Sequence, residues 1–536
     1  MQNQRQNGRP DAAVRMAGLF LVLFCVAAVL IPAKTLFTGN GFFADYIHFT
    51  ESKRMYVEIA ILAVLIFGGL ALLKRGRSRM YWLTAVVLVF SWIHVVFLPM
   101  VVSAVYLISL LAIGRFMRKR VFFRGTVWER PYFSFYMDFL FGASFAIVVY
   151  CLLSALGVGK IAWMRLSVYV LGVAALGFDF SSISCQCIMG WQTLSWMLDG
   201  SGGSREIPRR VRRAWTLAAG WCVLMFLIQV GRLNIALDFD TLWYGVRSQY
   251  IVAGGTGLYE NPGLVGMVYV YSKGFEVLTL PLCDLASHSY LTFFNLWLAV
   301  LGIGAMVWNA VLLTGERKQE TESREAGIEK KLTYRSVLPG IMAAVLSISV
   351  PGIMNMALTA KADLITWLLQ LIMLGCFFQY IHVYENHWIF LSGAAGSYFL
   401  SLTMKPTSLV FSTAVFGMMG LYLLWFWFHE RGAAADLFHH LVRLIGSLCL
   451  PFGALAGIWA RTMKITGMPV TSVFTSIFAW FGFKMKYPFA TSELPQNYQE
   501  ESTLHVLARR IWQMLMQPQG EDMGHVILAW GTSLMA

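Results

Sequence analysis

Charged residues are scarce in this chain. Only 13% of its 536 residues are charged, whereas 58% are hydrophobic and 15% are aromatic. Soluble domains contain roughly 45–50% apolar residues, so this composition excludes a soluble globular protein. Apolar runs recur from residue 16 to residue 460, which excludes a disordered or collagen-like chain. We therefore predict an all-α, polytopic membrane protein.

Cysteine is also rare, and its spacing shows no metal-binding pattern. Most of the 8 cysteines lie inside apolar runs, at positions Cys25, Cys151, Cys222, Cys376 and Cys449. The one close pair, Cys185 and Cys187, falls in a predicted cytoplasmic loop without metal-ligand spacing around it. We predict neither a disulfide framework nor a zinc site.

Acidic residues are outnumbered by basic ones. The chain has 28 Asp and Glu against 42 Lys and Arg, a net charge of +14. In a soluble protein this excess would indicate nucleic acid, but here the basic residues lie between apolar runs, where they orient helices. The expected partner is therefore the lipid bilayer and not nucleic acid. The turn-rich segment 254–263 lacks the Gly-Lys-Ser/Thr of a phosphate-binding P-loop, and we interpret it as a loop over the mouth of a cavity.

The apolar runs predict about thirteen membrane-spanning helices. The first covers residues 17–33, for which a signal peptide is the alternative interpretation. The later runs are 56–73, 81–98, 101–114, 136–156, 166–180, 214–230, 290–313, 337–354, 364–382, 388–402, 409–428 and 441–459. Basic residues cluster in every second loop, and the positive-inside rule places these loops and the N-terminus in the cytoplasm. We expect a multi-pass protein of a bacterial-type inner membrane.

This topology divides the chain into three regions. Residues 1–213 form a six-helix transmembrane module with basic cytoplasmic loops, and residues 214–460 form a core with a long external loop at 231–289. Residues 461–536 form an external or interfacial tail. Apolar residues in 504–516 recur on one face of a possible helix, which is typical of a helix lying along the membrane surface.

Two carboxylates follow the seventh predicted span. Asp238 and Asp240 lie beside Trp243 and Tyr244, at the predicted outer membrane surface. A carboxylate in a cavity there can accept a proton from an attacking hydroxyl or bind a divalent cation. The alternative is structural: either Asp caps an interfacial helix, and the aromatic residues belong to the interfacial belt.

Further ionisable residues end other spans on the same predicted side. Lys361 and Asp363 follow the ninth span, and Lys405 ends the eleventh. Each lysine taken singly is also explained by a side chain that extends to the interface. Pro406 breaks the helix after Lys405, which allows the ammonium to point into a cavity and neutralise a phosphate. We expect these clusters to converge on one outer surface.

The segment Asp-Thr-Leu-Trp-Tyr, from Asp240 to Tyr244, is similar to the Asp-x-x-x-Tyr motif of the GT-C superfamily. These integral-membrane glycosyltransferases use polyprenyl-phosphate sugars. In them the motif follows a transmembrane helix and leads into amphipathic external helices. A Lys-Pro or Lys-Gly at a helix end comes later, as Lys405-Pro406 does here, with an acidic residue in another external loop, as Asp363 is here. The resemblance covers residues 214–430, and it departs from the family in that six predicted spans precede the motif.

The resemblance implies a GT-C-like fold and an inverting transfer on the outer face of the membrane. The donor would be a polyprenyl-phosphate-linked sugar, and the acceptor a glycan, a lipid or a protein. Asp240 would be the general base toward the acceptor hydroxyl, or a ligand of an optional Mg²⁺ or Mn²⁺. Asp238 is the alternative carboxylate for either role, because the Asp-x-Asp pair leaves the register open.

The same resemblance assigns the remaining site residues. Lys405 would hold the donor phosphate, with Lys361 and Arg461 as further candidates. Tyr244 and Arg247 would line the site.

Two other functions are compatible with a dozen or so spans. An O-antigen polymerase or ligase also has an external loop, but such sites depend on external arginines, and the long loop here offers few beyond Arg232 and Arg247. A transporter would place ionisable residues near mid-membrane. Asp138 and Asp179 are the acidic candidates for that role in the first six spans.

Overall fold

The computed structural model describes most of the chain between residues 50 and 489. The described residues are 50–124, 131–199, 209–233, 241–242, 245–252, 257–261, 263–264, 266–314, 334–382, 387–429, 440–471 and 474–489, with residues 16, 505, 508 and 509. The chain divides into two units. One comprises Met1–Val64, Ser349–Asn355 and Leu494–Ala536, and the other comprises Leu65–Ile348 and Met356–Glu493. The second unit holds nearly all of the described residues.

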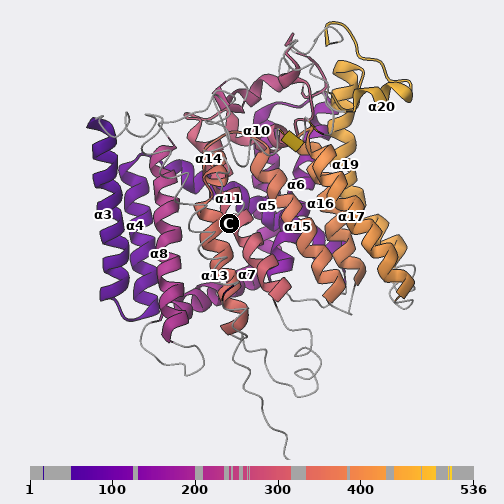
Figure 1. Ribbon diagram of the computed structural model, residues 1–536. Helices are drawn as coiled ribbons and strands as arrows, with labels where there is room; N and C mark the ends of the chain where they lie inside the picture. The colour runs from indigo at the N-terminus through magenta and orange to yellow at the C-terminus, as the bar shows by residue number, and fades with distance from the viewer. Residues whose placement is uncertain are drawn as a thin grey trace, which may run out of the picture. The chain divides into compact units, whose positions relative to one another are not determined.

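The described part of the chain consists of helices joined by loops (Figure 1). The elements, in chain order, are α3 (Thr50–Leu72), α4 (Gly76–Ile93), α5 (Phe97–Phe116), the π-helix η1 (Met117–Phe122), α6 (Pro131–Ala155), α7 (Ile161–Met197), α8 (Arg209–Arg232), the 3₁₀ helices η2 (Gly245–Ile251) and η3 (Met267–Tyr269), α10 (Gly274–Cys283), α11 (Ser289–Thr314), α13 (Tyr334–Ser349), α14 (Pro351–Met356), α15 (Asp363–His382), α16 (His387–Met404), α17 (Ser408–His429), α19 (Leu441–Thr466) and α20 (Thr475–Trp480).

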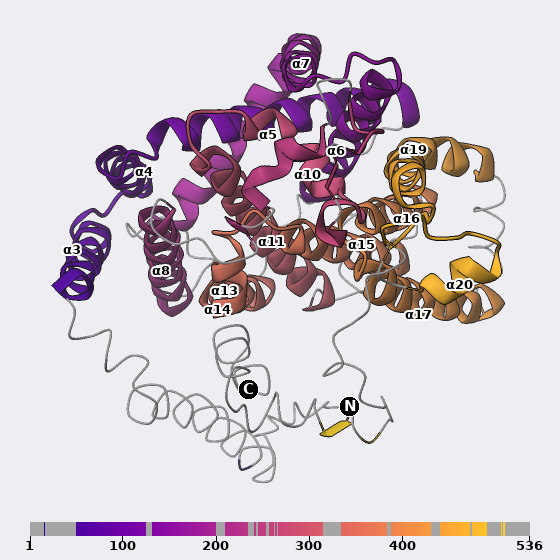
Figure 2. The ribbon, with the colours of Figure 1, turned by 90° about the horizontal axis from the view of Figure 1, so that it is seen from above.

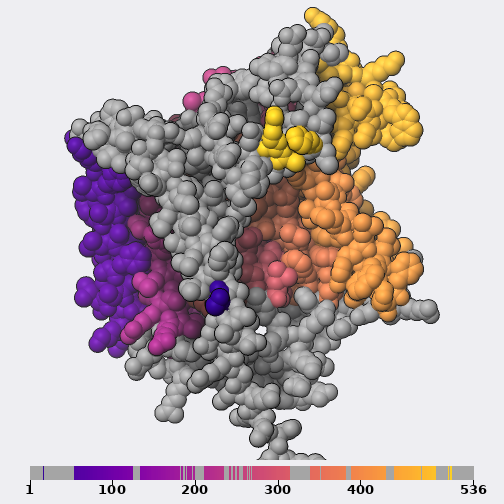
Figure 3. Space-filling view, in the orientation of Figure 1, coloured from indigo at the N-terminus to yellow at the C-terminus, as the bar shows by residue number. Residues whose placement is uncertain are grey.

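Nine helices in the described residues are long and apolar enough to cross a membrane. They are Lys53–Leu72, Phe97–Phe122, Phe133–Ala155, Ile161–Phe180, Arg210–Arg232, Ser289–Leu313, Asp363–Ile381, Ser408–His429 and Leu441–Thr466. Helix α17, which is part of the orange surface in Figure 3, carries large apolar side chains that are more than half exposed, among them Phe411, Leu421 and Phe428. Such a surface is suited to lipid contact. The prediction of a helical membrane protein is therefore confirmed, while the first predicted span, 17–33, lies outside the described residues.

Helix boundaries differ from the predicted runs at several places, among them the following three. The run 337–354 is divided, because α13 ends at Ser349 and Pro351, which has no backbone N–H, begins α14. Helix α7 continues beyond 180 to Met197, and its backbone leaves helical geometry at Asp179. Helix α19 continues beyond 459 to Thr466, so Arg461 lies within this helix and not after it.

Three helices of the larger unit, α5, α11 and α15, run in the same direction. Trp297 of α11 donates a 3.1 Å hydrogen bond to Ser103 of α5, near the start of both helices. Asn295 of α11 donates to the carbonyl of Thr359, just before α15, at 2.7 Å. Helices α5, α11 and α15 thus begin at the same end of the bundle, which we call the loop end. Helix α5 finishes in Arg115 at the opposite end, which we call the basic end.

Glycines allow a close helix contact in the core, between α5 and α6. A Cβ at Gly114 would overlap the carbonyl oxygen of Asp138, and a Cβ at Gly142 would overlap that of Leu110. Small residues at a helix crossing let two backbones approach, which provides packing energy inside a membrane, where the hydrophobic effect between helices is weak. This crossing is the centre of the bundle, because α5 and α6 also pack against α7, α11 and α19.

Replacing Gly114 with alanine is expected to destabilise the protein by about 1–3 kcal/mol, because the added methyl group meets backbone that has no rotamer to change. Gly177→Ala in α7 is the matched control, since no atom lies within 4 Å of its added Cβ. The midpoint of thermal unfolding in detergent measures both. Equal midpoints for the two variants would show that the α5–α6 crossing tolerates a wider separation.

A short buried helix lies among the longer ones at the loop end. Helix α10 packs against η2, α6, α7, α11 and α16, and Figure 2 shows it in the middle of these helices. All its residues from Gly274 to Leu282 are buried. A ten-residue helix is only about 15 Å long and cannot cross a bilayer. It therefore lies between the spanning helices, and its side chains pack against theirs.

Candidate functional site

The two residues that define the predicted motif, Asp240 and Tyr244, lie outside the described residues, whereas Thr241 and Leu242 between them and Gly245 after them are described. Asp238, Asp240 and Tyr244 are not among the residues that the structure describes. Thr241, the residue after Asp240, is fully buried, and its hydroxyl accepts a 3.1 Å hydrogen bond from the backbone N–H of Ala360.

Gly245, the residue after Tyr244, also contacts Ala360. A Cβ at Gly245 would lie 2.6 Å from the carbonyl oxygen of Ala360. Thr241 within the motif and Gly245 directly after it therefore both contact the residue that precedes Lys361.

Lys405 and Asp363 form an ion pair at the loop end. The Nζ of Lys405 lies 2.6 Å from Oδ1 of Asp363, and the two side chains are 35% and 33% exposed. Lys405 follows the end of α16, and Asp363 begins α15, so two helices that pack side by side supply the pair. A lysine that remains one-third exposed is accessible to an anion from outside the bundle.

The turn after Lys405 is fixed by Ser408. Pro406 has no N–H and cannot continue α16, which leaves carbonyls at the end of this helix without helical partners. The Ser408 hydroxyl lies 2.7 Å from the carbonyl oxygen of Ser401 and 2.5 Å from that of Lys405. This contact ties the first residue of α17 to the last turn of α16 and orients the Lys405 backbone.

The other predicted basic site residues, which were expected to bind the phosphate or to line the site, differ in exposure. Lys361 is partly buried in the loop before α15, and Arg247 is exposed in η2. Arg461 is only 1% exposed. Its Nε donates to the carbonyl of Leu258 and its Nη2 to that of Tyr269, each at 3.1 Å. Lys361, Asp363 and Lys405 thus lie together at the loop end, while Arg461 bonds to the backbone of the long loop.

Sequence reasoning missed a buried ion pair at the start of α10. Lys273 Nζ lies 2.7 Å from Oε1 of Glu276, and their side chains are 1% and 3% exposed. The ammonium also lies 4.1 Å from the ring centroid of Tyr271, a cation–π distance. Burial lowers the pKa of Lys273, the carboxylate of Glu276 opposes this shift, and the charge of Arg461 adds to it. A Lys and a Glu three residues apart inside an apolar run were the available signal.

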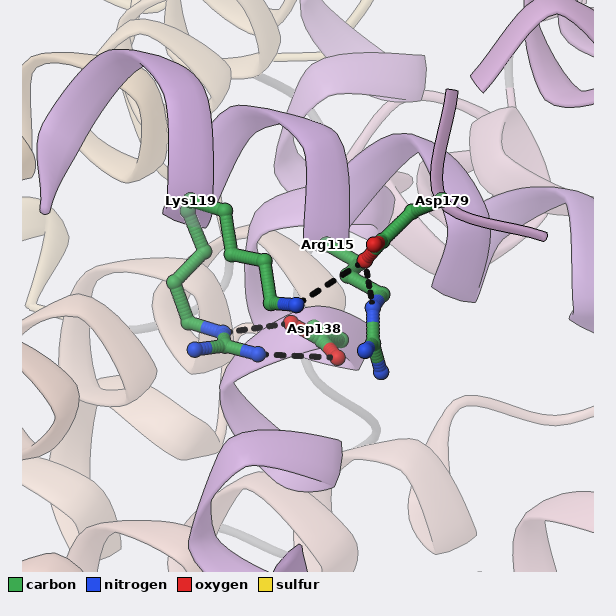
Figure 4. Close-up of polar contacts among 5 residues, drawn as sticks. Arg115, Lys119, Asp138 and Asp179 are labelled. Atoms are coloured by element: carbon green, nitrogen blue, oxygen red, sulfur yellow. Dashed lines mark hydrogen bonds and ion pairs between the residues drawn. The ribbon is translucent and has the colours of Figure 1, made fainter. Parts of the chain in front are cut away.

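A second charged cluster lies at the basic end (Figure 4). Arg118 of η1 forms a forked pair with Asp138 of α6, with its Nε 2.6 Å from Oδ1 and its Nη2 3.4 Å from Oδ2. Arg115 forms an ion pair with Asp179, and Lys119 lies 3.0 Å from the same carboxylate oxygen. The cluster joins α5, α6 and α7 where α5 passes into the π-helix and α7 bends.

This cluster contains the two acidic residues that were candidates for a transporter site. Asp138 and Asp179 are each paired with arginine near the basic end, and neither is an isolated acid at mid-bundle. The first role of these pairs is therefore structural, because a charge in this setting is stabilised only with its partner.

Comparisons with known proteins add no assignment. No family model, curated protein or solved structure matches the chain. The resemblance to the GT-C superfamily therefore depends on the motif residues and their order. Among the described residues no group of three His, Cys, Asp or Glu side chains is placed to hold a metal ion, and the candidate ligands Asp238 and Asp240 lie outside them.

Proposed function

We propose that the chain is an integral-membrane glycosyltransferase of GT-C type. It moves a sugar from a polyprenyl-phosphate donor to an acceptor hydroxyl at the outer face of a bacterial inner membrane, with inversion at the sugar. The observation that carries the proposal is the contact of Thr241 and Gly245 with Ala360. It connects the Asp-x-x-x-Tyr motif to the loop that contains Lys361 and leads into α15 at Asp363.

The roles follow from the chemistry of the groups. Asp240, one residue before the anchored Thr241, is the base that takes the proton of the acceptor hydroxyl, with Asp238 as the alternative. Lys405 binds the donor phosphate, and Lys361 adds positive charge beside it. In the absence of donor, Asp363 neutralises Lys405 at 2.6 Å. A phosphate carries more charge and more acceptor oxygens than this carboxylate, so it can compete for the ammonium.

The loop end is the outer end in this proposal. The basic end carries Arg115, Arg118, Lys119 and Arg120 on α5 and η1, and the positive-inside rule assigns such residues to the cytoplasm. A donor whose lipid tail lies in the outer leaflet would then present its phosphate at the level of Lys405.

The test of this function is a donor screen with the full chain in lipid nanodiscs. Radiolabelled polyprenyl-phosphate hexoses and pentoses are offered one at a time, and binding is measured directly. Transfer is measured in membrane vesicles of cells that carry the chain, which retain the acceptors. Binding of one donor and transfer of its sugar are expected. Failure of every donor to bind or react would contradict the proposed function.

Lys405→Gln is expected to weaken donor binding by about tenfold to a hundredfold, the value of one charge-assisted hydrogen bond of about 1.5–3 kcal/mol. Lys464→Gln is the matched control, because Lys464 is an exposed lysine near the end of α19. Donor titration of both variants measures the effect. An unchanged affinity in Lys405→Gln would remove Lys405 from the phosphate site without deciding the role of Asp240.

A further inference from the structure

Arg461 of α19 bonds to the long loop at two points. The carbonyls of Leu258 and Tyr269 each accept a hydrogen bond from its guanidinium at 3.1 Å. Nearby, the hydroxyl of Tyr259 lies 3.5 Å from the carbonyl oxygen of Gly457, one turn earlier on α19. Helix α19 therefore holds the 257–269 part of the loop through a side chain that is almost fully buried.

The Lys273–Glu276 pair lies further along the same loop, at the start of α10. It closes the first turn of α10, since the backbone N–H of Val277 also donates to the carbonyl of Lys273 at 2.8 Å. Oε2 of Glu276 and Nη1 of Arg461 are buried and find no partner among the described residues. Separating Lys273 from Glu276 would leave two buried charges without a counter-charge, which favours a fixed arrangement of this pair.

This fastened segment contacts the end of α16. A Cβ at Gly274 would lie 2.5 Å from the hydroxyl oxygen of Thr403 and 2.6 Å from its carbonyl oxygen. Thr403 is two residues before Lys405, and it is fully buried. The start of α10 therefore packs directly on the last turn of α16, and a displacement of α10 would be transmitted to the backbone that carries Lys405.

We propose that Arg461, Lys273 and Glu276 are positioning residues that hold segment 257–276 against α19 and α16 and thereby fix the position of Lys405. The consequence for donor binding rests on the proposed function, whereas the attachment of the segment to α19 and α16 does not. In this assignment Arg461 acts through the loop backbone and not by touching the donor phosphate.

Hydrogen exchange of the full chain in nanodiscs tests whether these residues attach the segment to α19 and α16. Arg461→Gln is expected to speed amide exchange at least tenfold in residues 257–273 and also in residues 400–411, while exchange in α5 and α6 is unchanged. Arg443→Gln is the matched control, because Arg443 is an exposed arginine of the same helix. Unchanged exchange in 257–273 would overturn the proposal. Faster exchange there without a change in 400–411 would overturn its link to Lys405.

A charge swap separates positioning from a general loss of folding. Lys273→Glu and Glu276→Lys singly place like charges together and are expected to open the segment or to prevent folding. The double variant restores one cation and one anion, and exchange within about threefold of the wild type is expected. A double variant no better than the singles would show that the pair does not hold the segment. Arg461→Lys, which keeps the charge and one donor, is expected to lie between wild type and Arg461→Gln.

The effect on the proposed reaction is read from donor affinity and turnover separately. Arg461→Lys is expected to raise the donor Kd severalfold with little change in turnover at saturating donor, because a misplaced Lys405 weakens binding and leaves the base intact. A fall in turnover at unchanged Kd would overturn this assignment. If the wild type binds no donor, the proposed function fails, and the exchange experiments still decide whether the three residues position the loop.

Discussion

Replacing Asp240 with asparagine is expected to lower the turnover of sugar transfer by about 10²–10⁴-fold, the usual contribution of a general base. Asparagine keeps the size of the side chain but cannot accept the proton of the acceptor hydroxyl. The neighbouring Thr241 and its hydrogen bond to Ala360 are untouched by this change, so folding and donor affinity should be preserved. Initial rates at saturating donor, with donor Kd measured in parallel, test the prediction.

Asp238→Asn is the matched control for this experiment, since it removes a carboxylate two residues away. A large loss in Asp238→Asn with a small one in Asp240→Asn would exchange the two roles. Near-normal transfer in both variants would show that neither carboxylate is the base. Repeating the assay with a chelator and then with added Mg²⁺ or Mn²⁺ tests whether the same carboxylate holds a metal ion, because a metal-dependent rate returns only with the ion.

The positions of the helices follow from the sequence because a bilayer imposes a simple rule. A span needs about 20 apolar residues, and this length can be read directly from the chain. The rule fails where a polar residue inside a helix has a hydrogen-bond or ion-pair partner close to it in space. Helix α19 continues through Arg461 because backbone carbonyls accept hydrogen bonds from its guanidinium. Helix α7 continues past Asp179 because Arg115 and Lys119 neutralise the carboxylate. Such partners are distant in sequence and cannot be read from hydropathy.

The candidate site could be predicted only in part for a related reason. Lys405 and Asp363 were expected on one surface because each ends a span, and the parity of the spans puts those ends on the same side. The Lys273–Glu276 pair was not predicted, because α10 is too short to be a span and its sequence resembles part of an external loop. Counting the spans gives the side of the membrane on which a loop residue lies. How deeply the loop enters the helix bundle depends on packing, here on the absence of a side chain at Gly274.

The charged cluster at the basic end has a different relation to function. It lies at the opposite end of α5 from the loop end, and the described residues show its two acids in ion pairs with arginine. The Arg118–Asp138 pair is buried, with side chains 9% and 7% exposed. Its effect is therefore expected on the stability of the α5–α6–α7 packing and not on donor affinity.

Asp138→Asn is expected to destabilise the protein by about 3–5 kcal/mol, since it leaves the buried guanidinium of Arg118 without a counter-charge. Asp284→Asn is the matched control, because Asp284 is exposed after α10. Thermal unfolding in detergent measures both.

The double variant Arg118→Leu/Asp138→Leu should recover most of the loss, because an apolar pair carries no desolvation cost. Recovery would show that the single variant suffers from an unpaired charge, and that the pair itself adds little net stability. A double variant as unstable as Asp138→Asn would instead show that the two hydrogen bonds are needed to shape the turn from α5 into the π-helix.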